Sequence, residues 1–288
     1  LDERKIHRGV VPRLGGIAFK PVIFVVMALI LGSTYVLGQN VILVNASKNI
    51  SQLAFLYSSL MILYLVGIAD DLVGVKFRAK FFAQIVCGIL LVIGGVWIEN
   101  LCGMFGVATL PYRFGAPLSI FFVVFIVNSI NLIDGIDGLV YLFVIICLVC
   151  FGFCFCDSGN IVYCYIAASM IGAIIVILCY NMFGSIEKKT KTFLGDSGSM
   201  TLGFSLAYLS VKYICAETSG SLDFQERILL CLSLLFVPCI DLCRVVIERL
   251  IHGDYLFSPD KRHIHYKFIA AGIFGRLALL SVLGVVLF

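Results

Sequence analysis

Charged residues are scarce in this sequence. Lysine, arginine, aspartate and glutamate together make up 13% of the 288 residues, and the net charge is only +4. Hydrophobic residues make up 61%, which is more apolar side chain than a soluble domain of this length can bury. The composition therefore excludes a soluble globular protein, and we expect no nucleic-acid partner.

Signals that divide a chain into parts are missing as well. The sequence has 6 prolines and no Pro/Ser-rich linker, low-complexity tract or clear repeat. We therefore expect one integral-membrane domain over residues 1–288. The chain opens with LDERKIHRGV, without an initiator Met or a recognisable signal peptide, and ends inside an apolar run. We expect the protein to have a further helix before residue 1.

Long runs without a charge recur along the chain, which is typical of membrane-spanning helices. We predict an all-α polytopic membrane protein with about nine spans in this chain and about 10–11 in the full-length protein. Asp241, Arg244 and Arg276 interrupt the last two spans. The predicted spans are 17–37, 51–69, 81–98, 116–130, 138–156, 161–181, 199–215, 228–248 and 269–288.

Lysine and arginine concentrate on one side of these spans. The alternate loops on the other side carry only Lys48, Arg113 and Arg227. Positively charged loops mark the cytoplasmic side of a membrane protein. The loops predicted to be cytoplasmic are 1–16, 70–80, 131–137, 182–198 and 249–268.

The 12 cysteines lie mostly in apolar segments, where free cysteine behaves as a small hydrophobic residue. Cys102, Cys156 and Cys215 fall near the same predicted side of the membrane. A disulfide among these three stays open on the sequence alone.

Four polar motifs fall in the predicted cytoplasmic loops, which suggests that they form one site. They are GIADDLVGVKFRAK, NSINLIDGIDG, KTFLGDSGS and SPDKRHIHYKF. In the first, Asp70 and Asp71 are adjacent carboxylates that repel and need a cation or a shared proton nearby. The alternative is a solvated acid pair beside Lys76 and Arg78.

The second motif places Asp134 and Asp137 three residues apart, so that on a helix they would share a face. Asn128 and Asn131 add amide groups on the preceding turn. Ionisable residues at the end of a membrane helix usually face a functional cavity. Helix capping is the alternative interpretation.

The third and fourth motifs suit phosphate groups. Gly195, Asp196 and Ser197 lie where a helix would begin, and the N–H groups there can bind phosphate or can simply be capped. His263 and His265 follow Arg262, a combination that favours phosphate over zinc, although a lipid headgroup would also suit it. Acids and a basic loop on one face suggest phosphoryl transfer with Mg²⁺, or Mn²⁺, held by carboxylates and phosphates.

These motifs, in this order, resemble the polyprenyl-phosphate N-acetylhexosamine-1-phosphate transferases. The resemblance covers nearly the whole chain, from residue 11 to residue 266, and NLIDGIDGL is its most specific string. The resembling segments are VPRLGG at 11–16, DD at 70–71, KFFAQI at 80–85, NSINLIDGIDGL, FLGDSGS and HIH.

The resemblance implies a multi-pass enzyme of the bacterial inner membrane, active at the cytoplasmic face. Such an enzyme transfers a sugar-1-phosphate from a UDP-sugar to undecaprenyl phosphate, releases UMP and begins a lipid-linked glycan of the cell envelope. A homodimer stays open. The branch that uses simple UDP-N-acetylamino sugars, such as UDP-N-acetylglucosamine, fits VPCIDLCR and GDYLFSPDKRHIHY better than the phospho-N-acetylmuramoyl-pentapeptide branch, which is the alternative.

By the same resemblance, Asp196 is expected to bind Mg²⁺, with Asp71 as a second ligand. Asp70, Asp71 and Asp196 are the expected catalytic residues, and Asp70 and Asp71 are expected to face the lipid phosphate, one of them as its activator. The residues expected to bind the substrates are Lys80, Asn128, Asn131, Asp134, Asp137, Phe193, Arg262, His263 and His265, with Phe193 stacked on uracil. Tyr266 departs from the family, which commonly has a histidine there, and this puts the role of that position in doubt.

Two other classes of membrane protein also carry acidic residues of this kind. A cation-coupled transporter would carry its acids near the bilayer midplane, whereas these lie at span ends beside basic residues. A CDP-alcohol phosphatidyltransferase would need Ala-Arg after its first Asp-Gly and two further spaced aspartates on the next helix turns. The segment DGIDGLVYLF offers Leu139 and Val140 instead, so this class does not fit.

Overall fold

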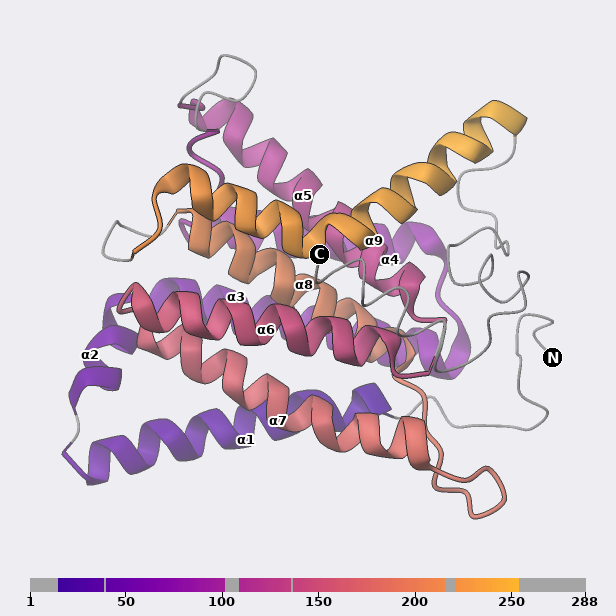
Figure 1. The fold of residues 1–288 in the computed structure, drawn as a ribbon, viewed down its shortest axis with the longest axis horizontal. Helices are drawn as coiled ribbons and strands as arrows, with labels where there is room; N and C mark the ends of the chain where they lie inside the picture. Colours follow the sequence, from indigo (N-terminus) through magenta and orange to yellow (C-terminus); the bar gives the residue numbers. More distant parts are fainter. Residues whose placement is uncertain (1–14, 39, 102–108, 136, 216–220, 254–288) are drawn as a thin grey trace.

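The computed structural model describes residues 15–38, 40–101, 109–135, 137–215 and 221–253 (Figure 1). Within these ranges the chain is helical apart from turns and one isolated antiparallel bridge between Asn100 and Thr109. The prediction of an all-α protein is confirmed. The helices are α1 (Gly15–Val36), α2 (Asn40–Lys48), α3 (Ile50–Val73), α4 (Phe77–Ile93), α5 (Tyr112–Ile133), α6 (Leu139–Asp157), α7 (Ile161–Phe183), α8 (Gly195–Ile214) and α9 (Phe224–His252).

Six helices in the described part of the chain are long and apolar enough to cross a membrane, namely α1, α3, α5, α6, α7 and α9. The predicted spans 81–98 and 199–215 correspond to α4, which has 17 residues, and to α8, which is less apolar. The predicted span 269–288 lies outside the described residues. The expected number of spans is therefore only partly confirmed.

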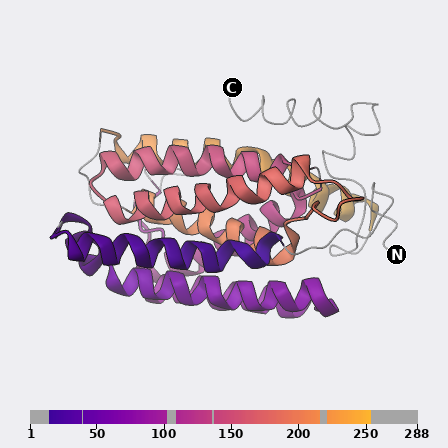
Figure 2. The ribbon, with the colours of Figure 1, turned by 90° about the horizontal axis from the view of Figure 1, so that it is seen from below.

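Helix α8 occupies the centre of the bundle, and α1, α3, α5, α6 and α9 pack against it. Figures 1 and 2 show α1, α3, α6 and α8 lying along the long axis of the molecule, and Figure 1 shows α5 crossing it obliquely. All residues of α8 are buried except Asp196 and Lys212. Its small residues allow close packing, because a Cβ on Gly203 would lie 2.9 Å from the Cα of Val127 in α5. A helix surrounded by protein does not need an apolar lipid-facing surface.

Helix α9 contains Pro238, and Figure 1 shows its two parts running in different directions. The charges that interrupt this predicted span are paired within the helix. Arg244 donates to Asp241 at 2.8 Å and to Glu248 at 2.9 Å. Ion pairing one turn apart explains how a span of this kind can contain both signs of charge.

The cysteines of the described residues are free thiols, and they include Cys156 and Cys215. Cys102 lies outside the described residues.

Candidate active site

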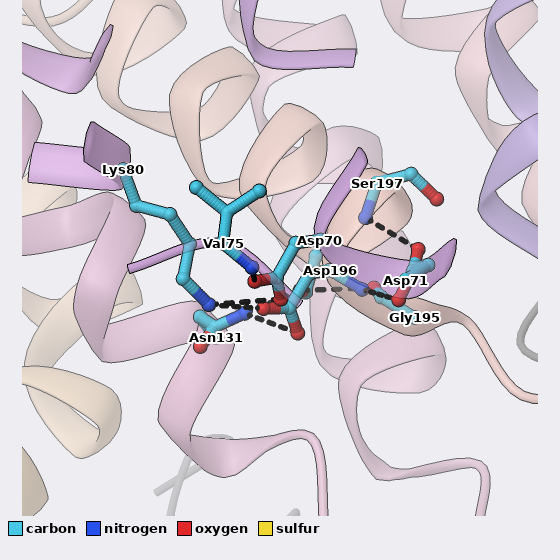
Figure 3. Close-up of polar contacts among 9 residues, drawn as sticks. Asp70, Asp71, Val75, Lys80, Asn131, Gly195, Asp196 and Ser197 are labelled. Carbon is cyan, nitrogen blue, oxygen red and sulfur yellow. Dashed lines mark hydrogen bonds and ion pairs between the residues drawn. The ribbon is translucent and has the colours of Figure 1, made fainter. Parts of the chain in front are cut away.

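The carboxylates of Asp70 and Asp196 share one lysine at the end of the bundle where α3 ends and α8 begins. The Lys80 ammonium of α4 lies 2.9 Å from Oδ2 of Asp70 and 2.7 Å from Oδ2 of Asp196 (Figure 3). The backbone N–H of Val75 donates to the other Asp70 oxygen at 2.7 Å. The side chains are partly buried, with 11% exposure for Asp70 and 22% for Asp196, so solvent screens the pairs only in part.

The second oxygen of Asp196 faces α5. Asn131 donates to it at 3.3 Å and to the Ser199 hydroxyl at 2.8 Å. Burial opposes the ionisation of Asp196, but hydrogen bonds and the Lys80 ammonium outweigh it and lower the pKa of this carboxyl to about 2. Asp196 is therefore an anion at any physiological pH.

Asp71 faces the first turn of α8 instead. Its two oxygens accept the backbone N–H of Asp196 at 2.9 Å and that of Ser197 at 3.0 Å, as Figure 3 shows. The first N–H groups of a helix have no partner within the helix and carry a partial positive charge. The positive charge that the adjacent acids require thus comes from Lys80 for Asp70 and from a helix N-terminus for Asp71. It does not come from Lys76 or Arg78.

Glycines let three backbones meet at the start of α8. A Cβ on Gly67 of α3 would lie 2.3 Å from the Cα of Ser197, and one on Gly16 of α1 would lie 2.3 Å from the N of Gly198. The N–H of Gly16 also donates to the carbonyl of Leu194 at 2.8 Å. The glycines of the VPRLGG motif therefore hold the segment that leads into Asp196.

A second polar group lies beside the turn between α5 and α6. Lys191 forms an ion pair with Asp137, and its ammonium lies 5.9 Å from the centre of the Phe193 ring. Asn181 joins the two segments, because it accepts from the N–H of Gly138 at 2.8 Å and donates to the carbonyl of Thr192 at 3.0 Å. These contacts bring a carboxylate, a cation and an aromatic ring to the edge of the site.

Asp134 and Asp137 do not share a helix face. Helix α5 ends at Ile133, and α6 begins only at Leu139. The spacing rule for a helix does not apply to acids in a turn. Gly138 has φ +82°, in the left-handed region that a continuous helix does not contain.

Asn128 lies one turn deeper in α5 and does not join the contacts of Asp196. It donates to the buried Gln84 of α4 at 2.6 Å and to the carbonyl of Val124 at 2.7 Å. The amide pair packs α4 against α5 behind Lys80.

The structure thus gathers five of the predicted residues, Asp70, Asp71, Lys80, Asn131 and Asp196, at one place. Asp137 and Phe193 lie with Lys191, and Arg262, His263 and His265 lie outside the described residues.

Three contributors were missed by the sequence reasoning. Lys191 lies two positions before Phe193 in KTFLGDSGS, and Ser199 ends the same motif, so both could have been found there. Gln84 lies inside KFFAQI, and no feature of that string marks it out. Its part in the structure follows from its burial on one face of α4, which the sequence alone does not show.

Among the described residues, no group of three or more His, Cys, Asp or Glu side chains forms a ready-made metal site. Mg²⁺ is commonly held by one or two carboxylates together with substrate phosphates. Asp70 and Asp196 converge on a single ammonium, and burial and the neighbouring Asp196 raise the pKa of the Asp70 carboxyl. This pair of oxygen donors fits a cation that receives its remaining ligands from substrate and water.

The sequence of this chain has known relatives. The sequence profile of glycosyl transferase family 4 matches residues 53–214, more than half of the chain. This chain belongs to glycosyl transferase family 4. The matched region of this family 4 protein contains Asp70, Asp71, Lys80, Asn131 and Asp196, and with them the whole of the acid–lysine cluster.

Relatives of this family 4 protein match almost its entire length. The undecaprenyl-phosphate alpha-N-acetylglucosaminyl 1-phosphate transferase of Yersinia pestis is 26% identical over 98% of this chain and 74% of its own. The probable undecaprenyl-phosphate N-acetylglucosaminyl 1-phosphate transferase of Bacillus subtilis is 28% identical, over 98% and 72%. The decaprenyl-phosphate N-acetylglucosaminephosphotransferase of Mycobacterium tuberculosis is 29% identical, over 97% and 70%.

Proposed function

We propose that this protein transfers a sugar 1-phosphate from a UDP-sugar to undecaprenyl phosphate. The sugar is N-acetylglucosamine or a related N-acetylated amino sugar. The observation that carries the proposal is the convergence of Asp70 and Asp196 on Lys80 at the end of the bundle where α3 ends and the buried α8 begins. The names of the relatives support the same lipid acceptor and the N-acetylglucosamine branch. The excess of Lys and Arg in the loops on this side supports a cytoplasmic site in a bacterial inner membrane.

The reaction exchanges one phosphorus–oxygen bond for another. An oxygen of the lipid phosphate forms a bond to the phosphorus that carries the sugar, and the bond from that phosphorus to the bridging oxygen breaks. The bridging oxygen leaves with its electron pair as part of UMP. A phosphate monoester has a second pKa of about 6 and is mostly ionised at neutral pH, so little work remains for a general base.

The main task of the protein is to bring together two groups that are both negatively charged. Lys80 supplies a cation 2.7 Å from Asp196, where it can approach a phosphate without leaving the cluster. Bound Mg²⁺ would offset the charge that develops on the departing phosphate. Asp196, with Asp70 beside it, would hold the ion, and Mn²⁺ suits the same oxygen donors.

The nucleotide would bind beside this cluster. Phe193 offers a ring for uracil, and the Lys191 ammonium near it offers a cation for a phosphate. Asp134 and Asp137 would line the same site, with Asn131 at its inner side, and a nucleotide contact by Asn128 stays a prediction from the sequence. Roles for Arg262, His263 and His265 at the pyrophosphate, a homodimer and a single domain over the whole chain stay predictions from the sequence.

A lipid-linked transfer assay tests the proposal. Purified protein is mixed with undecaprenyl phosphate, Mg²⁺ and radiolabelled UDP-sugars, including UDP-N-acetylmuramoyl-pentapeptide. We expect label from UDP-N-acetylglucosamine or a close relative to enter the lipid phase with release of UMP. Asp196→Asn should lower the rate by about a hundredfold or more, because it removes the central anion of the site.

Asp157→Asn is the matched control. Asp157 lies at the opposite end of the bundle, where it accepts hydrogen bonds from Ser221, and its replacement should leave transfer within about threefold of the unsubstituted protein. Folded protein that transfers no label from any donor would overturn the proposed function.

A further inference from the structure

The adjacent carboxylates at the end of α3 have different surroundings. Asp70 shares Lys80 with Asp196, whereas both oxygens of Asp71 accept backbone N–H groups at the start of α8. Among these contacts, only those of Asp71 connect the acid motif of α3 to the backbone of the helix that carries Asp196. The structure therefore separates the pair that the sequence presents as a unit.

Two glycines show that the chain is shaped around this contact. Gly195 has φ +73°, and a Cβ at that position would lie 2.6 Å from one oxygen of Asp71 and 2.8 Å from the other. Gly67 lies one turn before Asp71 on the same face of α3, and it lets the α3 backbone reach the Cα of Ser197. Side-chain hydrogen bonds and backbone contact act together at the same turn.

The electrostatic surroundings of Asp71 also indicate its role. Its two oxygens face the N-terminus of α8, which carries a partial positive charge of about half an elementary unit. A carboxylate is stabilised there, but a divalent cation placed at the same oxygens would be repelled by the N–H groups that they accept. Asp70 accepts a backbone N–H, that of Val75, at only one of its oxygens, and the other oxygen meets the Lys80 ammonium. Asp196 meets only side-chain donors, Lys80 and Asn131, which can move aside for a cation.

We propose that Asp71 is a positioning residue that orients Asp196 through the first turn of α8, and that it is not the second metal ligand predicted from the sequence. The N–H that Asp71 accepts at 2.9 Å belongs to Asp196 itself, so it fixes the backbone from which the catalytic carboxylate projects. The consequence for transfer rests on the proposed function, but the consequence for metal binding can be measured without it.

The first experiment measures the binding of Mn²⁺ to the purified full chain by electron paramagnetic resonance. Asp196→Asn should weaken the binding by about tenfold or more, because it removes a ligand. Asp71→Asn should weaken the binding less than Asp196→Asn does, because no ligand is lost, Asn retains one acceptor, and Lys80 and Asn131 still hold Asp196. In the transfer assay, Asp71→Asn should lower kcat by about tenfold and leave the KM for the UDP-sugar nearly unchanged.

A thiol version of the experiment separates ligation from positioning. Thiolate binds Cd²⁺ more strongly than it binds Mg²⁺, so a true ligand replaced by Cys can regain function in Cd²⁺. Asp196→Cys should regain part of its Cd²⁺ binding and transfer, whereas Asp71→Cys should regain neither, with the unsubstituted protein as the background for the native cysteines. If Asp71→Asn does not fold, this pair of Cys variants decides the question.

The proposal is overturned if Cd²⁺ restores Asp71→Cys, or if Asp71→Asn weakens Mn²⁺ binding as much as Asp196→Asn does. A protein that binds Mn²⁺ as expected but transfers no sugar would refute the proposed function and leave the role of Asp71 intact. The two failures are therefore distinguishable.

Discussion

The two ends of the helix bundle use polar residues in different ways. At the end opposite the site, polar side chains join neighbouring segments. Asn45 donates to the carbonyl of Gly159 at 3.0 Å and accepts from the N–H of Val162 at 3.1 Å, and Asp157 accepts two hydrogen bonds from Ser221. No carboxylate there shares a lysine with another carboxylate among the contacts of the described residues.

At the site end, the same residue types are gathered rather than distributed. Two carboxyl groups meet one ammonium, which is one carboxyl group more than a simple ion pair needs. Asp71 is the exception, because it joins segments as the polar residues of the opposite end do. The comparison teaches that proximity to a site does not by itself assign a chemical role.

The largest effect should come from the shared lysine. Lys80→Met leaves Asp70 and Asp196 facing each other without the cation between them, so transfer should fall by about a hundredfold or more. Lys212→Met is the matched control, because Lys212 of the opposite end donates to a neutral partner, Asn49, at 3.2 Å. The measurement is label transfer. Equal losses of transfer in the two variants would contradict a special role for the lysine of the site end.

A pair of glycines tests the close approach at the start of α8. Gly195→Ala should lower transfer by about tenfold and reduce thermal stability, because its Cβ would meet Asp71. Gly159→Ala at the opposite end has a similar φ, +71° against +73°, but a Cβ there has no neighbour within 4 Å. Both variants carry the backbone strain, of about 1–2 kcal/mol, so only Gly195→Ala should lose transfer beyond what its stability explains.

Much of this arrangement could be predicted from the sequence. The uncharged runs predicted the main helices to within a few residues, and the parity of the loops placed the acids of DD and FLGDSGS at one end. Which acid meets which partner could not be predicted. The choice of Lys80 over Lys76 depends on how α4 packs against α3 and α5, and local spacing carries no information about the distance from Lys80 to Asp196.

The turn between α5 and α6 shows a second limit. Three-residue spacing favours a helix face, but Gly138 allows a left-handed turn that separates Asp137 from the helical register. The pairing of Asp137 with Lys191 then depends on a loop 54 positions later in the chain. Tertiary contacts of this length lie outside what residue patterns specify.

A smaller effect is expected from this second pair. Lys191→Met should raise the KM for the UDP-sugar by about tenfold with a lesser change in kcat, because it removes a cation near Phe193 but leaves the acid–lysine cluster intact. Lys188→Met, an exposed position in the same loop, serves as the control. An unchanged KM, determined from initial rates across UDP-sugar concentrations, would remove Lys191 from the nucleotide site.

The smallest effect concerns pH. The pKa of Asp196 is lowered to about 2 in the folded protein, against about 3.9 for an unfolded chain. Its contribution to stability is therefore complete above about pH 4 and is lost as the pH falls towards 2. Between pH 6 and pH 3, Asp196→Asn should lose less stability in thermal unfolding than the unsubstituted protein, by about 1 kcal/mol after solvent screening.

The burial of α8 has a consequence for how the protein is made. Of the helices that pack against α8, α1, α3, α5 and α6 precede it in the chain, and only α9 follows. A helix rich in Ser, Gly and Thr gains little from lipid, but it meets most of its partners already synthesised when it enters the membrane. The order of the helices along the chain thus supplies a protein environment for a helix that is too polar to count among the six candidate membrane spans.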